Sequence, residues 1–303
     1  MNPDPRQIMH DLGMDPVAIK HVDTLSEENS HALWRIVTPE KSYILKWLPE
    51  ADARIEINGY LLLQELGVPT LPLYGCTAQA LLLEDLTRSD RWRLAIQADT
   101  ARAEVGGAVA RWYRIFHNAG EALLSHRDCP SFLRRETDEL EPDNILAAGR
   151  ALGLANYHVW DLACKHIELL KAAVEKLSIT LNYNDFHWTN LALSRREGDQ
   201  LEAITFDYHL LGVGMRYSDC RNVVGSLSGD AVNAFWDTYG YVDLREAELD
   251  RPLADLYTFY VASRMSKFPK WAQDSRERVI NGDLEKDLIS TFEVALSLYE
   301  TTA

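Results

Sequence analysis

The chain has 303 residues, enough for one large domain or two average ones, and its 47% hydrophobic and 25% charged residues are typical of globular proteins. It has no apolar run of roughly 18 residues, no signal-like N-terminus and no paired cysteine motif, which predicts a cytoplasmic protein that has no contact with a membrane. The net charge of -15, spread over the chain, argues against a nucleic-acid partner, because phosphate binding needs a basic face.

The first third of the chain is predicted to contain strands and one helix. Two apolar-aromatic runs, 31–38 and 41–48, are separated by "PEK" and predict a hairpin. The stretch "ARIEINGYLLLQELG" has helical spacing and reaches a helix stop at Gly67. The run "ALLLEDL", 80–86, predicts a short buried strand that leads into a polar stretch, where we expect a boundary between two lobes.

The rest of the chain is predicted to be mostly helical. Residues 101–120 and 156–177 carry apolar residues at helical spacing, and the first of these helices is expected to end at its last glycine. Within this helical part, "NLALS" and "LEAITF" flank the polar turn "RREGDQ" and predict an embedded strand pair. The order predicts an α+β protein, with a β-rich lobe of residues 1–86 and a larger helical lobe of residues 87–303.

Three polar side chains surround this embedded hairpin. Asn190 precedes its first strand and Asp207 follows its second, so the two should meet at one end of the antiparallel pair, within reach of Asp185 on the loop leading in. Carboxylate and amide oxygens suit Mg²⁺, which commonly takes its other ligands from water and substrate phosphates. The alternative is that Asp185 and Asn190 cap the loop, because Asp and Asn favour turns.

Lys46 lies inside the apolar run "YILKWL". A lysine in such a strand is unfavourable unless its charge is paired. The alternative is an edge strand from which the amine reaches solvent.

The segments "YNDFHWTN" and "ITFDYHLLGVGMRYSD" resemble the catalytic and metal loops of the aminoglycoside phosphotransferase and choline kinase family, which has a two-lobed protein-kinase-like fold. The resemblance follows the element order of nearly the whole chain. It implies that Asp185 is the catalytic base, that Asn190 and Asp207 bind Mg²⁺, and that Asp219 braces the catalytic loop.

The same resemblance extends to the first third. It implies that Lys46 contacts the nucleotide phosphates and that Glu56 is its ion-pair partner. "LLLEDL" resembles the hinge between lobes, where backbone groups of Glu84 to Leu86 would hold the adenine edge. His117 is interpreted as a packed histidine at a helix end.

Two departures from the family pattern stand out. Tyr183 occupies the place of a bracing histidine two residues before the base. Glu27 and Glu28 stand where the family often has glycines in the phosphate loop, and carboxylates close to phosphate are repulsive.

The resemblance implies an ATP- or GTP-dependent, Mg²⁺-dependent small-molecule kinase. Its acceptor would be a hydroxyl of an aminoglycoside, a choline-like alcohol, a sugar or an amino acid. The alternative is a degenerate kinase-like protein that binds nucleotide or regulates without turnover. A hydrolase is set aside because "GSLSG" has Leu227 where a nucleophile elbow needs serine. The sequence leaves the oligomeric state open.

Overall fold

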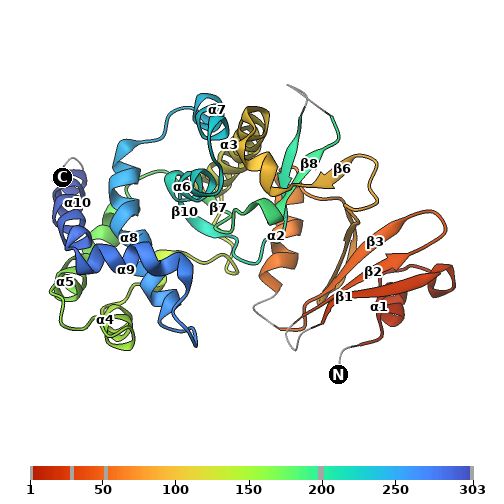
Figure 1. Ribbon diagram of the computed structural model, residues 1–303, viewed down its shortest axis with the longest axis horizontal. Helices are drawn as coiled ribbons and strands as arrows, with labels where there is room; N and C mark the ends of the chain where they lie inside the picture. Colours follow the sequence, from red (N-terminus) through yellow and green to blue (C-terminus); the bar gives the residue numbers. More distant parts are fainter. Residues whose placement is uncertain (1–2, 28–30, 51–53, 197–200, 301–303) are drawn as a thin grey trace. The chain divides into compact units, whose positions relative to one another are not determined.

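The computed structural model describes residues 3–27, 31–50, 54–196 and 201–300. Contacts within the chain divide it into two compact units, drawn in Figure 1. Unit 1 comprises Met1–Ala119, Tyr183–Leu211 and Asn222–Gly240, and unit 2 comprises Gly120–Asn182, Gly212–Arg221 and Tyr241–Ala303. The sequence predicted two lobes that meet between residues 86 and 87. The two units are each built from several segments and do not test this boundary, which stays a prediction.

The main sheet of unit 1 is antiparallel and has the strand order β1-β2-β3-β5-β4. Its strands are β1 (His21–Glu27), β2 (Ala32–Val37), β3 (Ser42–Trp47), β4 (Leu73–Cys76) and β5 (Ala80–Glu84). The predicted hairpin is confirmed, since β2 and β3 pair with Leu33 opposite Lys46. Apolar side chains from α1 (Pro5–Asp11), β2 and β3 form a buried cluster in this unit.

Helix α2 (Arg54–Glu65) follows β3 in the chain. Gly67 has a φ of +71°, a left-handed conformation that favours glycine and ends a helix, so the predicted stop is confirmed. The buried face of α2 includes the charged Glu56 beside Ile57 and Tyr60. A buried carboxylate of this kind needs a partner.

The embedded hairpin is also present. β8 (Leu191–Ser194) pairs antiparallel with β9 (Ala203–Thr205), and β6 (Trp92–Leu94) extends this sheet on the other side of β8. The backbone N–H of Phe206 donates to the carbonyl of Asn190 at 3.1 Å, so the two ends of the hairpin meet as predicted. Of the predicted turn "RREGDQ", residues 197–200 lie outside the described part of the chain.

The expectation that the first long helix ends at Gly120 is wrong, because α3 runs from Ala103 to His126. A Cβ atom at Gly120 would lie 2.4 Å from the backbone nitrogen of Leu181. The glycine therefore permits close packing of helix on strand instead of ending the helix. His117 accordingly lies within the helix and not at its end.

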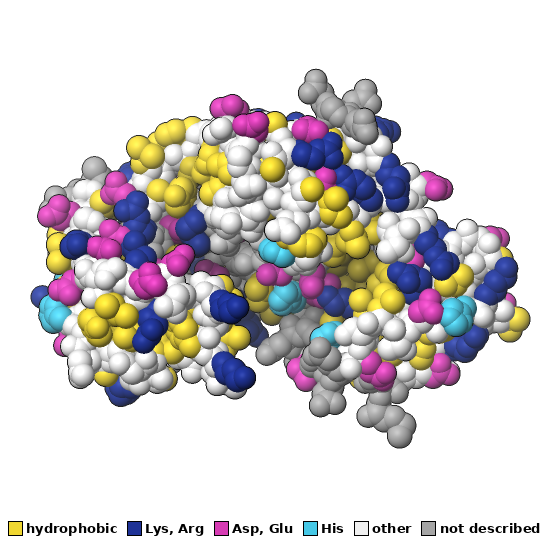
Figure 2. All heavy atoms as spheres, in the orientation of Figure 1, with side chains coloured by type: hydrophobic (Ala, Val, Ile, Leu, Met, Phe, Trp, Pro, Cys, Tyr) yellow, Lys and Arg dark blue, Asp and Glu magenta, His cyan; other side chains and the backbone are white. Residues whose placement is uncertain are grey.

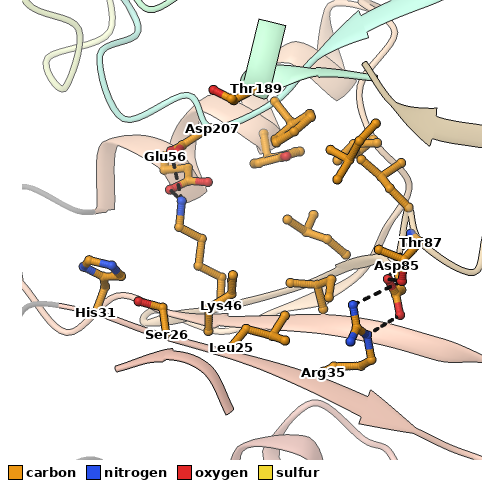
Figure 3. Close-up of a pocket in the computed structure, with 18 residues that line it drawn as sticks. Leu25, Ser26, His31, Arg35, Lys46, Glu56, Asp85, Thr87, Thr189 and Asp207 are labelled. Atoms are coloured by element: carbon orange, nitrogen blue, oxygen red, sulfur yellow. Dashed lines mark hydrogen bonds and ion pairs between the residues drawn. The ribbon is translucent and has the colours of Figure 1, made fainter. Parts of the chain in front are cut away.

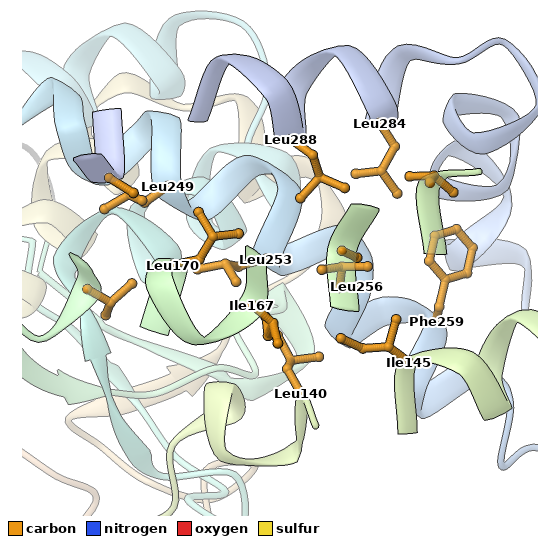
Figure 4. Close-up of a cluster of buried hydrophobic side chains, with 14 of the residues drawn as sticks. Leu140, Ile145, Ile167, Leu170, Leu249, Leu253, Leu256, Phe259, Leu284 and Leu288 are labelled. Carbon is orange, nitrogen blue, oxygen red and sulfur yellow. The ribbon is translucent and has the colours of Figure 1, made fainter. Parts of the chain in front are cut away.

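Unit 2 is built on helices that surround one apolar core (Figure 4). They are α4 (Pro142–Ala151), α5 (Val159–Val174), α8 (Leu244–Ala262), α9 (Gln273–Ile280) and α10 (Asp283–Glu300). Their buried residues include Leu256, Phe259 and Leu288, and α5 lies within the predicted helix at 156–177. A two-stranded antiparallel sheet of β7 (Ile179–Asn182) and β10 (Gly212–Met215) completes the unit.

The remaining elements are α6 (Arg216–Ser226), α7 (Asp230–Tyr239) and the 3-10 turns η1 (Pro16–Ala18), η2 (Gln97–Ala101), η3 (Glu136–Glu139), η4 (Trp188–Asn190) and η6 (Lys270–Ala272). Figure 2 shows acidic side chains interspersed with basic ones on the visible face, as expected from the spread of charge along the sequence. None of the helices among the described residues combines the length and apolarity needed to cross a membrane.

Candidate active site

Unit 1 contains a cavity of about 400 Å³ that has charged residues at two ends and apolar residues between them (Figure 3). Lys46, Glu56 and Asp207 lie at one end, and Arg35 and Asp85 lie at the other. The apolar lining comes from Leu25, Leu33, Ile44, Tyr60, Leu71, Leu83, Leu86, Leu94 and Phe206. A flat apolar molecule with polar groups at its two ends would suit such a space.

Lys46 is bound by two carboxylates at the first end of the cavity. Its Nζ lies 2.6 Å from Oε2 of Glu56 and 2.9 Å from Oδ1 of Asp207. β3 lies between β2 and β5, and the Lys46 side chain is only 16% exposed, so the edge-strand alternative is wrong. Burial lowers the pKa of Lys46, but the two carboxylates outweigh it and raise the pKa above its ordinary value. The amine therefore stays charged.

Glu56 contributes the second member of this ion pair from the first turn of α2. Burial raises the pKa of Glu56 to about 7, although the charge of Lys46 opposes the shift. The predicted ion pair between Lys46 and Glu56 is present, and it ties β3 to α2.

Asp207 follows β9 in a left-handed backbone conformation, with a φ of +68°. Its Oδ1 accepts hydrogen bonds from Lys46 at 2.9 Å and from Nδ1 of His209 at 3.0 Å. Burial favours the protonated acid, but the His209 hydrogen bond and the Lys46 charge hold the pKa of Asp207 well below its usual range. Its other oxygen, Oδ2, has no hydrogen-bond partner in the described part of the chain.

Asp185 and Asn190 are joined to each other on the loop that leads to β8. Nδ2 of Asn190 donates to Oδ2 of Asp185 at 2.7 Å and to its carbonyl at 3.3 Å. The turn η4 is capped by the side chain of His187 and not by Asp185. Burial and the nearby charge of Asp207 raise the pKa of Asp185. Both hydrogen bonds join residues of the same loop, as the loop-capping alternative expects, so the catalytic role of Asp185 stays a prediction.

The residue before Asp185 has an unusual conformation. Asn184 has a φ of +64°, and its Nδ2 donates to the carbonyl of Leu210 at 3.2 Å. Asparagine tolerates the left-handed region better than most residues. Asn184 therefore connects the loop of Asp185 to the segment that follows Asp207.

Tyr183 supports the same two segments. It is fully buried, and its hydroxyl donates to the carbonyl of Phe206, next to Asp207. Its ring packs edge-to-face on Tyr208, which packs in the same way on Tyr60 of α2. Where the family has a bracing histidine, the tyrosine thus supplies a hydrogen bond between the two loops.

The segment after β5 contributes a residue with unpaired backbone groups to the cavity lining. Leu86 is buried and lines the cavity, and neither its N–H nor its carbonyl has a partner among the described residues. The side chain of Glu84 is not part of the cavity lining. It pairs with Lys41 and accepts a hydrogen bond from Tyr74. The backbone N–H of Glu84 donates to the carbonyl of Pro72 at 3.1 Å, so only the carbonyl of Glu84 could serve this site.

Comparison with known proteins identifies relatives by structure alone. No family model matches the chain, and no curated protein matches it in sequence. Among solved structures, choline kinase from Cryptosporidium parvum Iowa II superposes with a TM-score of 0.60 at 11% identity, over 97% of this chain and 98% of that one. Spectinomycin phosphotransferase APH(9)-Ia, in complex with ADP and spectinomycin, gives 0.54 at 12% identity over 99% of each chain. The GDP complex of wild-type aminoglycoside 2'-phosphotransferase-IIIa gives 0.56 at 13% identity, over 93% of this chain and 96% of that one.

The chain has the protein-kinase-like fold of these phosphotransferases. This is the α+β fold that the resemblance predicted. The sequence identities are too low for the roles of individual residues to follow from the superposition, so those roles depend on the geometry of the site.

The predicted site residues fall into two connected groups. Lys46, Glu56 and Asp207 are in direct contact, and Asp185 is joined to Asn190. The charge of Asp207 acts on Asp185, which couples the two groups electrostatically.

The sequence also singled out His117, Asp219, Glu27 and Glu28. His117 is buried, with its Nδ1 2.7 Å from the hydroxyl of Tyr239. Asp219 is also buried, and its bracing role stays a prediction. Glu27 ends β1 as an exposed residue and is not part of the cavity lining, whereas Glu28 lies outside the described residues.

Two residues of this cavity, and a third that contacts Asp207, escaped the sequence reasoning. They are Arg35, Asp85 and His209. Arg35 and Asp85 stand within the apolar runs "HALWRIVT" and "ALLLEDL". The argument applied to Lys46, that a charge in a buried strand needs a partner, would have found them.

The donor atoms fit a magnesium ion. The unpaired Oδ2 of Asp207 and the Oδ1 of Asn190, whose Nδ2 is already used, are hard oxygen ligands. Mg²⁺ commonly takes one or two protein ligands and completes its shell with water and phosphate oxygens. The ionised state of Asp207 suits this role.

Proposed function

We propose that this protein is a small-molecule kinase that transfers the γ-phosphate of ATP or GTP to a hydroxyl group with the help of Mg²⁺. The observation that carries the proposal is the cluster in the cavity of unit 1. There a buried lysine is held by the carboxylates of Glu56 and Asp207. The charge of Asp207 also raises the pKa of Asp185. The same set of roles recurs in phosphoryl transfer by kinases.

Lys46 would bind the nucleotide phosphates. Its raised pKa keeps a positive charge in the cavity, and Glu56 holds the amine in place from α2. When phosphate oxygens enter, the ammonium group still has a proton to donate, because it has three N–H groups and two carboxylate partners.

Asp207 and Asn190 would hold the metal ion through Oδ2 and Oδ1. Bound Mg²⁺ would neutralise charge on the phosphates. His209 and Lys46 both contact Oδ1 of Asp207, which orients the carboxylate and leaves its other oxygen for the ion.

Asp185 would orient the acceptor hydroxyl and take its proton. Its raised pKa brings it closer to that of an effective base near neutral pH, while Asn190 fixes one of its oxygens. The unpaired backbone groups of Leu86 would hold the edge of the base, together with the carbonyl of Glu84.

The acceptor is a small molecule that carries a hydroxyl group. An aminoglycoside, a choline-like alcohol, a sugar and an amino acid all satisfy this description. We place the reaction in the cytoplasm, where nucleoside triphosphates are available.

A nucleotide-binding protein without turnover is the second candidate, and it is favoured by Tyr183 at the place of the bracing histidine. The hydrogen bond from Tyr183 to Phe206 weakens this alternative, because the tyrosine still braces the two loops.

The test begins with nucleotide binding. Calorimetry with ATP and GTP, with and without Mg²⁺, should show Mg²⁺-dependent binding that is weakened in Lys46→Met. A panel of hydroxyl compounds is then screened for nucleotide consumption, with Asp185→Asn as the inactive control. Absence of Mg²⁺-dependent nucleotide binding would contradict the proposal. Tight binding, without consumption for any acceptor class, would favour the second candidate.

A further inference from the structure

The second charged end of the cavity is organised around the carboxylate of Asp85. Its Oδ2 accepts hydrogen bonds from Nε of Arg35 at 2.8 Å and from Oγ of Ser42 at 2.5 Å. Its Oδ1 accepts from Oγ1 and the backbone N–H of Thr87, at 2.6 and 3.1 Å. Both oxygens are therefore used, and the side chain is only 1% exposed (Figure 3).

These donors come from three separate segments. Arg35 lies on β2, Ser42 on β3, and Thr87 two residues after Asp85. Burial raises the pKa of Asp85, but its hydrogen bonds outweigh this effect and lower the pKa below the ordinary value. A charged Asp85 thus fastens the segment after β5 to two neighbouring strands.

Leu86, with its unpaired backbone groups, lies between Asp85 and Thr87, whose side chains and backbone are joined by hydrogen bonds. The carbonyl of Asp85 accepts from the N–H of Arg88 at 3.0 Å, so Leu86 is enclosed by hydrogen bonds on both sides. Buried backbone groups without partners are rare in proteins. Their presence beside a cavity points to a ligand that pairs with them.

A similar arrangement in unit 2 provides a comparison. Asp255 accepts from Oγ of Ser275 at 2.6 Å and from Nε of Arg278 at 2.7 Å. It is also buried, although its side chain is 12% exposed against 1% for Asp85, and it is not part of the cavity lining in unit 1. The chemistry of the two clusters is alike, and their positions differ.

We propose that Asp85 is a positioning residue for the nucleobase, and that Arg35, Ser42 and Thr87 hold it in place. The inference rests on the proposed nucleotide-binding function of this cavity. The anchored turn fixes the N–H and carbonyl of Leu86, which then pair with a base that offers an acceptor and a donor on one edge. Because the hinge is held before the ligand arrives, binding does not have to order it.

The test separates recognition of the base from recognition of the phosphates. Calorimetry measures the affinity of the whole chain for Mg²⁺-ATP and for inorganic tripolyphosphate with Mg²⁺. Asp85→Asn and Thr87→Val should each weaken ATP binding, by about tenfold for the first, and leave tripolyphosphate binding unchanged. Asp255→Asn is the matched control, and it should lower the melting temperature without changing either affinity.

Thr87→Val keeps the inference testable if Asp85→Asn does not fold, since Thr87 is exposed and valine has the same shape. ATP affinities equal to the parent in these variants would overturn the inference and leave the proposed function intact. Equal losses for ATP and tripolyphosphate would show a general structural role and overturn it too. If the parent binds neither ligand, the proposed function fails and the inference fails with it.

Discussion

The two units differ in how they use buried charge. In unit 2, Asp255 is paired with Ser275 and Arg278 through both of its oxygens. In unit 1, by contrast, Lys46 is shared by two carboxylates, and one oxygen of Asp207 has no partner among the described residues.

The difference matters because burying a charge is unfavourable unless its bonds are completed. A completed cluster can be purely structural. A cluster with an unused oxygen is completed only when a ligand or a metal ion binds. We therefore expect substitutions in the cluster of unit 1 to change activity, and substitutions in the interior of unit 2 to change stability.

Asp185→Asn should give the largest effect. Asparagine has nearly the same shape but cannot take a proton, so turnover should fall by about 10³-fold while nucleotide affinity is kept. Steady-state kinetics with an accepted hydroxyl compound and calorimetry with Mg²⁺-nucleotide measure the two quantities. If this variant loses Mg²⁺-dependent binding as well, Asp185 is a metal ligand and the assignment of the base is wrong.

Asp207→Ala should lose both turnover and Mg²⁺-dependent nucleotide binding. Loss of a direct ligand should exceed the roughly 10- to 100-fold effect that is typical for residues one shell further out. Asn190→Ala should show the same pattern more weakly, because a neutral amide oxygen contributes less to a dication than a carboxylate. Calorimetry across a Mg²⁺ series separates the two variants, and parent-like binding in both would show that the hairpin is not a metal site.

The sequence predicted the charged cluster better than its surroundings. A lysine in an apolar strand needs a counter-charge, and the family resemblance named Glu56 as that partner, which the structure confirms. The two ends of the embedded hairpin were predicted to meet, and the N–H of Phe206, next to Asp207, does bond to the carbonyl of Asn190. The hydrogen bond from His209 to Asp207 was missed, because nothing in the local pattern shows where a side chain two residues further on will point.

The fold shows a similar division between local and long-range features. The hairpin of β2 and β3 and the end of α2 at Gly67 follow from local patterns. The end of α3 was predicted wrongly because Gly120 serves a contact with Leu181, which is distant in sequence. The pairing of β7 with β10 was also not foreseen, since their separation leaves no turn signal.

Leu256→Ala tests the expectation that substitutions in the interior of unit 2 change stability. Leu256 is 2% exposed in the core of unit 2 (Figure 4), so its truncation should lower the free energy of unfolding by about 2–3 kcal/mol. Denaturant titration measures the change. Ile289→Ala, at a half-exposed position on α10, is the control and should cost less than about 0.5 kcal/mol. Equal effects of the two variants would contradict the assigned core.

Glu246 is a buried carboxyl of unit 2 that accepts a backbone N–H and forms no ion pair within the described residues. It is 3% exposed in the first turn of α8, where its Oε2 accepts the N–H of Tyr217 at 2.9 Å. Burial raises the pKa of Glu246 to about 7, against 4.5 for the ordinary side chain, and the neighbouring acid Asp243 adds to the shift. Between these two values the folded protein holds a proton that the unfolded chain releases.

The stability that this proton contributes is therefore complete below pH 4.5 and is lost as the pH rises through 7. Glu246→Gln cannot ionise, so its stability relative to the parent should be about 2–3 kcal/mol more favourable at pH 8 than at pH 5. Melting temperatures at the two pH values measure the difference. Glu248→Gln, at an exposed position of the same helix, removes the same charge and should show no such pH dependence. If the two variants behave alike, Glu246 is ionised in the fold, and its burial does not hold a proton that the unfolded chain releases.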